Sequence, residues 1–400
     1  MTSSSDNWSH ALKELGQWLD AHGELWRPSP FVHPNPAWLR THPELGQQCM
    51  EYSAEQLESL AKRPYSELDW LQDQLPQLGP LPAALSLGLR EPAHHQPPQT
   101  RAASGIPGRK WAQICAFAEQ VPADDQPLLD WCSGKAHLGR HLAARDGSAL
   151  HAVERNPALC EQGQDLAQRQ GLECSYQVAD VLNQPTIIPA GAHVVALHAC
   201  GDLHRSLANH PQLDQAQHIT LAPCCYQLWL QQQYQPLSAA AQGHDLRLSR
   251  NQVQLAVQDL VHAPARERRA HQTMAAWRLA FDSLQRELRG VDAYWPTPSL
   301  PHRQLKDGFA AFIRRLAKLK DLSLPASLDW AAWETQGWTR LERARRLQVV
   351  RHAFRRPLEI WLVLDIALRL QERGFSMEIT TFCPRQTTPR NLLLRGYRPD

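Results

Sequence analysis

Between residues 109 and 230, short apolar runs alternate with helical stretches, and this pattern constrains the fold more than any other feature of the chain. The apolar runs are PLLDWCSG (127–134), SALHAVE (148–154), CSYQVAD (174–180), AHVVALHAC (192–200) and HITLAPCC (218–225). Helical patterns begin between them, near His137, at Asn156-Pro157 and at Asp202. Such alternation of strand and helix indicates a parallel sheet with helices on both faces.

The end of the chain extends this sheet. PLEIWLVLDIALRLQERG (357–374) predicts an amphipathic helix that ends at Gly374. SMEITTFC (376–383) and NLLLRGY (391–397) predict two strands with a hairpin-like connection between them. We therefore expect an α/β fold, a Rossmann-like doubly wound sheet of seven strands.

The remaining segments divide the chain further. Residues 1–95 carry apolar positions at helical spacing, interrupted by proline, and predict a helical N-terminal domain. A proline-rich linker is expected at 91–108. The core domain then comprises 105–230 and 357–400, and a helical insert spans 231–356.

Cysteine usage and hydropathy indicate a reducing compartment. The nine cysteines are scattered and never spaced CxxC, which disfavours a disulfide scaffold or a zinc ribbon. No basic and then apolar leader is visible at the N-terminus. The longest apolar run contains Glu359, Asp365 and Arg369 and is too short to cross a membrane. We expect a cytoplasmic protein with no membrane partner.

Charge is distributed unevenly along the chain. Residues 266–356 carry 19 Lys and Arg against nine Asp and Glu, whereas residues 1–100 carry six against twelve. A basic segment of this kind indicates a polyanionic partner, with a solvated helical surface as the alternative. The cations form three clusters: Arg266/Arg268/Arg269, Arg314/Arg315/Lys318/Lys320 and Arg343/Arg345/Arg346/Arg351/Arg355/Arg356.

Acidic residues end three consecutive predicted strands. These are Asp130, Glu154 and Asp180. Glu154 lies 24 residues beyond Asp130, a distance at which an acid binds ribose hydroxyls, although such acids also cap helices. Three acids would repel a pyrophosphate and suit a positively charged nucleoside, S-adenosylmethionine. The expected cofactor-binding residues are Arg109, Lys110, Asp130, Cys132, Ser133, Gly134, Lys135, Ala136, His137, Leu138, Glu154, Arg155, Asp180, Val181 and His198.

Three motifs carry a resemblance to a known family. LLDWCSGKAHLG, ALHACGDL and APCCY, in this order, resemble the Rossmann-like methyltransferases of the methyltransferase-32 domain family, which includes part of the glutathione S-transferase C-terminal-domain-containing protein. More distantly, they are similar to tRNA 2′-O-methyltransferases that act on the acceptor stem. The resemblance covers 109–230 and, faintly, the tail with TPRN. Cys132 and Ala136 stand where such loops usually have glycine.

The cysteines at the expected strand ends leave four interpretations open. Cys200, Cys224 and Cys225 could line the cofactor site as small inert residues. The PCCY stretch could form a floor on which a base or amine stacks on Tyr226. Two cysteines could act covalently, as in RNA 5-methylcytosine enzymes. A metal site with histidine is the fourth, but the spacing matches no usual zinc motif and we assign no metal.

The expected catalytic residues follow from transfer of a methyl group, which requires a nearby proton acceptor. For that role we expect Asp202, His198 or His204. Cys200, Cys224, Cys225 and Tyr226 complete the expected catalytic residues through the covalent and base-stacking interpretations above. His198 could instead be structural, and Arg109 and Lys110 a solvated turn rather than an anchor for the methionine carboxylate. We expect an S-adenosylmethionine-dependent methyltransferase that acts on tRNA or rRNA. The alternatives are a methyltransferase for a protein or small molecule and a non-catalytic binding module.

Overall fold

The structure is a computed structural model that describes residues 4–60, 65–87, 103, 105–258 and 265–399. Two compact units make up the chain. Unit 1 comprises 1–21, 80–258 and 355–400, and unit 2 comprises 22–79 and 259–354. The expected segments 1–95 and 231–356 are therefore each divided between the two units. Most of the expected linker at 91–108 lies outside the described residues.

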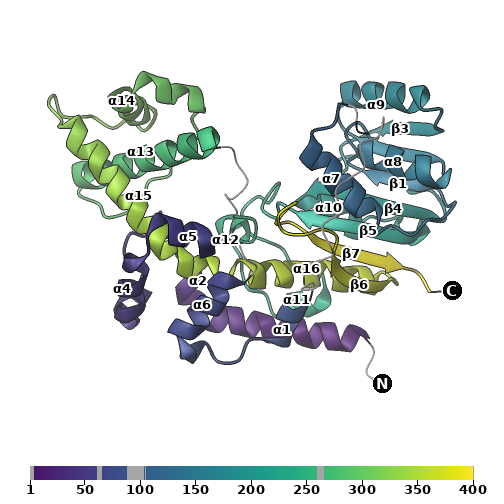
Figure 1. The fold of residues 1–400 in the computed structure, drawn as a ribbon, viewed down its shortest axis with the longest axis horizontal. Coiled ribbons are helices and arrows are strands. Elements are labelled where there is room, and N and C mark those ends of the chain that lie inside the picture. The colour runs from purple at the N-terminus through teal and green to yellow at the C-terminus, as the bar shows by residue number, and fades with distance from the viewer. Residues whose placement is uncertain (1–3, 61–64, 88–102, 104, 259–264, 400) are drawn as a thin grey trace. The chain divides into compact units, whose positions relative to one another are not determined.

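A seven-stranded sheet forms the centre of unit 1 (Figure 1). Its strands are β1 (Leu128–Trp131), β2 (Leu150–Glu154), β3 (Cys174–Val178), β4 (Ala192–Cys200), β5 (Ala216–Cys224), β6 (Ser376–Thr381) and β7 (Leu392–Tyr397). Their order is β3-β2-β1-β4-β5-β7-β6, and β7 runs antiparallel to both neighbours while the other pairs are parallel. The predicted Rossmann-like fold with seven strands is confirmed.

Helices of unit 1 connect and cover these strands. They are α7 (Gly108–Ala118), α8 (His137–Asp146), α9 (Pro157–Arg169), α10 (Asp202–Ala208), α11 (Ala239–Gly243), α12 (Arg250–Leu255), α16 (Arg355–Glu372) and α1 (Ser4–Ala21). Trp111, Phe117 and Leu142 from α7 and α8 share one buried core cluster with Val195 of β4. Asn156 caps α9 by accepting from the N–H of Ala158, as its Asn-Pro start predicts.

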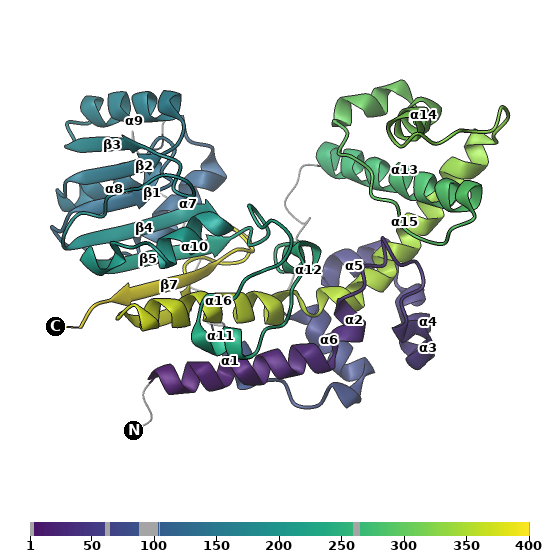
Figure 2. The ribbon, with the colours of Figure 1, turned by 180° about the vertical axis from the view of Figure 1, so that it is seen from behind.

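Helix α16 is buried on nearly every side, and α1 lies along it (Figures 1 and 2). Its Asp365 is fully buried and accepts from the hydroxyl of Tyr234 at 2.7 Å and from the main-chain N–H of Ser238 at 2.8 Å. These bonds attach the segment after β5 to the core. Residues 231–258 therefore belong to unit 1 and not to the basic part of the chain.

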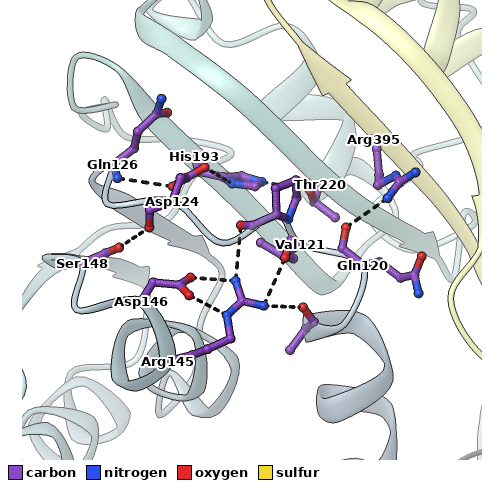
Figure 3. Close-up of polar contacts among 12 residues, drawn as sticks. Gln120, Val121, Asp124, Gln126, Arg145, Asp146, Ser148, His193, Thr220 and Arg395 are labelled. Carbon is purple, nitrogen blue, oxygen red and sulfur yellow. Dashed lines mark hydrogen bonds and ion pairs between the residues drawn. The ribbon is translucent and has the colours of Figure 1, made fainter.

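A polar network joins the loops at the amino end of the sheet (Figure 3). Arg145, near the end of α8, donates to the carbonyls of Ala118 at 2.8 Å and Val121 at 3.1 Å. His193 lies between Asp124 at 3.6 Å and the hydroxyl of Thr220 at 2.9 Å. The pKa of Asp124 is lowered, chiefly by its hydrogen bond to His193. The polar side chains at this end of the sheet thus bond to one another and to the main chain.

Unit 2 is helical. Its helices are α2 (Gly23–Trp26), α3 (Trp38–Thr41), α4 (Pro43–Glu51), α5 (Ala54–Leu60), α6 (Ser66–Gln74), α13 (Ala265–Arg289), α14 (Phe309–Leu319) and α15 (Trp330–His352). Trp277, Phe281 and Phe312 lie at the centre of its core. At Gly337 a Cβ would lie 2.4 Å from the carbonyl oxygen of Ala276, so glycine allows α15 to approach α13. No helix among the described residues is long and apolar enough to cross a membrane.

Candidate active site

The direction of the strand order reverses between β1 and β4, and the loop after β1 lies at this switch point. Three of its residues have a positive φ: Cys132 at 57°, Gly134 at 59° and Ala136 at 47°. The N–H of Gly134 donates to the carboxylate of Glu154 at 3.0 Å. A left-handed conformation costs a non-glycine residue about 1 kcal/mol. The fold therefore holds Cys132 and Ala136 in a conformation that the more usual glycines would adopt without strain.

Asp130, at the end of β1, is turned toward the protein. Its side chain is only 3% exposed and accepts from the main-chain N–H of Gly139 in α8 at 3.0 Å. Burial raises the pKa of Asp130 to about 7, and Gly139 and the charge of Lys110 partly oppose this rise. Asp130 therefore positions the loop and α8.

Glu154 and Asp180 remain partly exposed at the ends of β2 and β3. Glu154 accepts from the N–H groups of Gly134 and Asn156, at 3.0 and 2.9 Å. Asp180 accepts from the N–H of Leu182 at 3.1 Å and from the side-chain amide of Asn183 at 2.9 Å. Since a carboxylate offers about four acceptor positions, each acid can also accept from a ligand. Capping and ligand binding are compatible here.

The two basic residues at the start of α7 differ in whether their side chains are already bonded within the protein. Arg109 donates from Nε to the carbonyl of Thr387 at 3.0 Å, which joins α7 to the loop before β7. Lys110 is exposed, and its charge acts on Asp130 and His137. The geometry therefore suits Lys110 better than Arg109 as the anchor for a carboxylate.

Other predicted cofactor residues shape the loop from inside. Ala136 and Leu138 are buried in the core cluster of α7 and α8. His137 lies 2.9 Å from the guanidinium of Arg140 through Nδ1. Burial, followed by the charge of Lys110, lowers the pKa of His137 to about 4, so its ring is neutral at pH 7. Ser133, Lys135 and Val181 are partly exposed at the loop and after β3.

Three cysteine thiols meet at the carboxyl ends of β4 and β5. The sulfur atoms of Cys200, Cys224 and Cys225 all lie within 4.8 Å of one another, and those of Cys200 and Cys224 are 3.2 Å apart. Cys132 is also partly exposed at this edge, and burial is the main cause of its raised pKa. The pKa of Cys225 is lowered because the other two thiols hydrogen-bond its sulfur.

The predicted proton acceptors lie at the carboxyl end of β4 and in the helix that follows it. His198 is exposed with φ +71°, beside a register shift between Leu197 and Cys200 that turns it out of the strand. Asp202 begins α10, 3.5 Å from Arg205, and burial raises its pKa. His204 is fully buried, bonds the carbonyl of Ala199 at 2.8 Å, and has a pKa lowered by burial to about 4. His204 is thus a neutral core residue.

The aromatic platform expected at Tyr226 is not available, because Tyr226 is 1% exposed and bonds the carbonyl of Pro223. The chain turns inward after the left-handed Cys225 (φ +45°). Trp229, three residues later, is 45% exposed, and the guanidinium of Arg155 lies 5.0 Å from its ring centroid. Trp229 was not predicted as a functional residue, although the stretch APCCYQLW contains both Tyr226 and Trp229.

Arg390 is a second residue that the sequence analysis missed. It donates to the carbonyl of Val257 at 3.1 Å, and its charge acts on Cys200 and Cys225. The TPRN stretch in the tail was the available signal. The loop between β6 and β7 therefore brings positive charge to Cys200 and Cys225.

Residues 109–232 match the model of the methyltransferase-32 family, which describes a methyltransferase domain. By sequence, this segment is similar to a methyltransferase domain. The match confirms the resemblance carried by its three motifs, and the topology of the sheet agrees with it. No curated protein matches the chain.

Several solved structures resemble parts of the chain. One is TrmK from M. capricolum in complex with S-adenosyl-homocysteine: 14% identity, 27% of this chain covered, 50% of that chain covered, and a TM-score of 0.24. Another is the tRNA (uracil-54, C5)-methyltransferase of Pyrococcus abyssi with the same ligand: 18% identity, 28% of each chain, TM-score 0.23. Coclaurine N-methyltransferase shares 16% identity over 45% of this chain and 57% of its own, with TM-score 0.25. The chain thus covers half or less of the length of the first two of these proteins.

S-adenosylmethionine is the cofactor that the matched domain implies, and the residues at the switch point fit it. A Cβ at Gly134 would meet no atom within 4 Å, so the space beside the loop is open. Glu154 and Asp180 can accept from hydroxyl and amino groups of a nucleoside. Lys110 can bind the carboxylate of the methionine part. The negative charge of the two acids complements the positive charge of the sulfonium.

Proposed function

We propose that the protein is an S-adenosylmethionine-dependent methyltransferase that acts on RNA. The observation that carries the proposal is the methyltransferase match over 109–232, in a sheet whose switch point carries the loop and acids described above. The cofactor supplies an electrophilic methyl group on sulfur when it is bound. Glu154 binds the ribose hydroxyls, Asp180 and Val181 hold the adenine, and Lys110 binds the methionine carboxylate.

The acceptor loses a proton when the methyl group is transferred to nitrogen or oxygen. His198 is the best placed group to receive it, because it is exposed at the end of β4 and its pKa is lowered, chiefly by partial burial, so the ring is neutral and can accept a proton. Asp202 follows the same strand, and its raised pKa favours a proton acceptor. We assign proton transfer to His198, with Asp202 as the alternative proton acceptor.

Trp229 is the aromatic residue on which we propose that a nucleobase stacks. Its exposure of 45% leaves part of the ring accessible, and the guanidinium of Arg155 lies over the ring, 5.0 Å from its centroid. Stacking of a base on an aromatic side chain contributes about 1–3 kcal/mol of binding free energy without reading the sequence.

Unit 2 supplies the exposed positive charge for the phosphates. Arg314, Arg315 and Lys318 are exposed on α14, as are Arg266 and Arg269 near the start of α13. Cations at such positions contact phosphates and orient a nucleic acid without sequence specificity. An RNA substrate is the polyanion that this surface favours.

The third predicted cluster of cations does not support this role. Arg346 donates to the carbonyl of Tyr52 at 3.1 Å, and Arg351, 3% exposed, donates to that of Trp26 at 2.9 Å. Arg343 bonds the side-chain oxygen of Asn35 at 3.0 Å, and Arg355 bonds the carbonyl of Gln258. These four guanidinium groups hold the fold together, so we place the RNA surface on the exposed cations of the first two clusters.

Methyl transfer from radiolabelled S-adenosylmethionine into a total cell extract tests the proposal. We expect label in RNA that ribonuclease removes, and no label with the His198→Ala variant. Label that survives ribonuclease would replace RNA by a protein or small-molecule acceptor. A chain that binds no S-adenosylmethionine in a thermal-shift titration would be a non-catalytic module, because a ligand of the folded state must stabilise it.

A further inference from the structure

The three thiols at the ends of β4 and β5 form a cluster that cofactor binding and proton transfer leave unused. Cys200 and Cys224 are cross-strand partners, and Cys225 follows directly. Their sulfur atoms lie within 4.8 Å of one another. Cys224 is 3% exposed, whereas Cys200 and Cys225 are partly exposed, so the cluster can be reached from one side.

Backbone geometry brings these sulfur atoms together. Adjacent residues in a regular strand point to opposite faces of the sheet, so Cys224 and Cys225 would be expected to diverge. Cys225 instead has φ +45°, a left-handed conformation that costs a residue with a side chain about 1 kcal/mol. Both sulfur atoms then lie beside that of Cys200. Strain that gathers functional groups is typical of a ligand site.

A close backbone contact supports this arrangement. The N–H of Gly201 donates to the carbonyl of Cys224 at 3.0 Å, and the N–H of Leu228 donates to that of Cys225 at 2.9 Å. At Gly201 a Cβ would lie 2.1 Å from the carbonyl oxygen of Leu228. The turns after β4 and β5 are thus joined through main-chain atoms, which positions the thiols before any ligand binds.

We propose that Cys200, Cys224 and Cys225 bind one Zn²⁺ ion as thiolates and leave its fourth coordination position open. Zinc bonds to thiolate sulfur at about 2.3 Å, so two sulfur ligands of a tetrahedral ion lie about 3.8 Å apart. The observed separations, 3.2 Å for Cys200 and Cys224 and at most 4.8 Å for the others, bracket this value. Small rotations of the side chains complete the triangle.

Ligand chemistry and charge favour zinc. Soft thiolates select zinc, copper(I) or iron–sulfur clusters over magnesium or calcium. Among the described His, Cys, Asp and Glu residues, the cluster contains three ligands and no fourth, which is the pattern of sites that bind water or substrate. Three thiolates around one Zn²⁺ leave one net negative charge on the site, which the charge of Arg390 balances.

Metal binding can be measured on the full-length protein without any activity assay. The protein is stripped with a chelator under anaerobic reducing conditions and reloaded with zinc alone, and bound metal is determined by elemental analysis. We expect one zinc per chain, and at least tenfold weaker binding in each of the variants Cys200→Ser, Cys224→Ser and Cys225→Ser. Cys174→Ser, which changes a partly exposed cysteine in β3, is the matched control and should bind zinc as the unmodified protein does.

Two further measurements test the site where a variant does not fold. Cobalt(II) in place of zinc should show thiolate-to-cobalt charge-transfer absorption. In the unmodified protein, zinc should protect the partly exposed Cys200 and Cys225 from a maleimide, as mapped by mass spectrometry, whereas the labelling of Cys174 should be the same with and without zinc. Zinc far below one per chain, no charge-transfer band, or a Cys200–Cys224 disulfide in place of protected thiols would overturn the site. None of these results depends on methyl transfer, so they are independent of the proposed function.

Discussion

The carboxylate of Asp130 in β1 accepts a hydrogen bond from the main-chain N–H of Gly139 in α8 at 3.0 Å, and both residues are buried. This bond fixes the helix against the strand on either side of the cofactor loop. Gly139 is needed because a Cβ there would lie 2.6 Å from Leu150 and 3.0 Å from Asp130.

Gly139→Ala should lower the free energy of unfolding by about 1–3 kcal/mol, since overpacking displaces α8 from β1. Urea unfolding measures the change. Gly243→Ala is the matched control, because a Cβ at that position in α11 meets no atom within 4 Å. Equal effects of both substitutions would contradict the close packing.

Asp130→Asn should remove a pH dependence of stability. The folded-state pKa of Asp130 is about 7 because of burial, whereas an unfolded Asp titrates near 4. Between these values the folded state holds a proton that the unfolded state lacks, so the free energy of unfolding falls as pH rises from about 4 to 7, by up to about 4 kcal/mol. Urea unfolding at pH 5 and pH 8 should show a smaller difference in the variant. The exposed Asp165→Asn should keep the full difference.

Glu154→Gln should weaken the binding of S-adenosylmethionine by about 10- to 100-fold, because hydrogen bonds to a charged group contribute about 1.5–3 kcal/mol. Isothermal titration calorimetry gives the Kd. Glu161→Gln on the exposed side of α9 provides the comparison and should leave the Kd unchanged. An unaltered Kd in Glu154→Gln would mean that this carboxylate only caps the loop and α9.

The combined substitution of Arg314, Arg315 and Lys318 by Ala should weaken RNA binding and its dependence on salt. For three lost contacts to single-stranded RNA, the slope of log K against log salt should decrease in magnitude by about 2. Fluorescence anisotropy at several salt concentrations measures it. The exposed residues Lys13, Arg40 and Arg169, changed together to Ala, form a control of equal charge that should preserve the slope.

Gly201→Ala should be more destabilising than Gly191→Ala. Both glycines have a positive φ, +60° and +71°, so both substitutions carry the left-handed cost of about 1 kcal/mol. Only the first also meets the carbonyl oxygen of Leu228. We expect an additional loss of about 2 kcal/mol in the free energy of unfolding. If chemical denaturation gives equal values, the backbone contact after β4 and β5 is not close in solution.

The strands could be predicted because burial leaves a local record in the sequence. VVAL in β4 is a continuous apolar run, and LLDW in β1 is buried at all four residues although it contains Asp130, as strands covered on both faces require. The acids at the ends of β1 and β2 could be predicted from the same local pattern, because their position depends only on where each buried segment ends. Their roles were not, because the bond between Asp130 and Gly139 depends on how α8 packs.

The surface roles of aromatic and basic residues could not be read from local pattern. Tyr226 and Trp229 lie three residues apart, yet the left-handed Cys225 directs the first inward while the second stays 45% exposed. Arg351 and Arg314 are both in basic helical stretches, but Arg351 is buried against the carbonyl of Trp26. Such differences depend on partners that are distant in the sequence.

By itself, the sequence determined where strands and helices alternate, that there are seven strands, and that 109–232 resembles a methyltransferase domain. These features could be predicted because hydrophobic periodicity and short motifs are local. Only the tertiary structure decided that Cys200, Cys224 and Cys225 meet, that residues 22–79 and 259–354 form one unit, and which cations remain exposed. These depend on strand register, one left-handed residue and helix packing, which join parts of the chain that carry no common local signal.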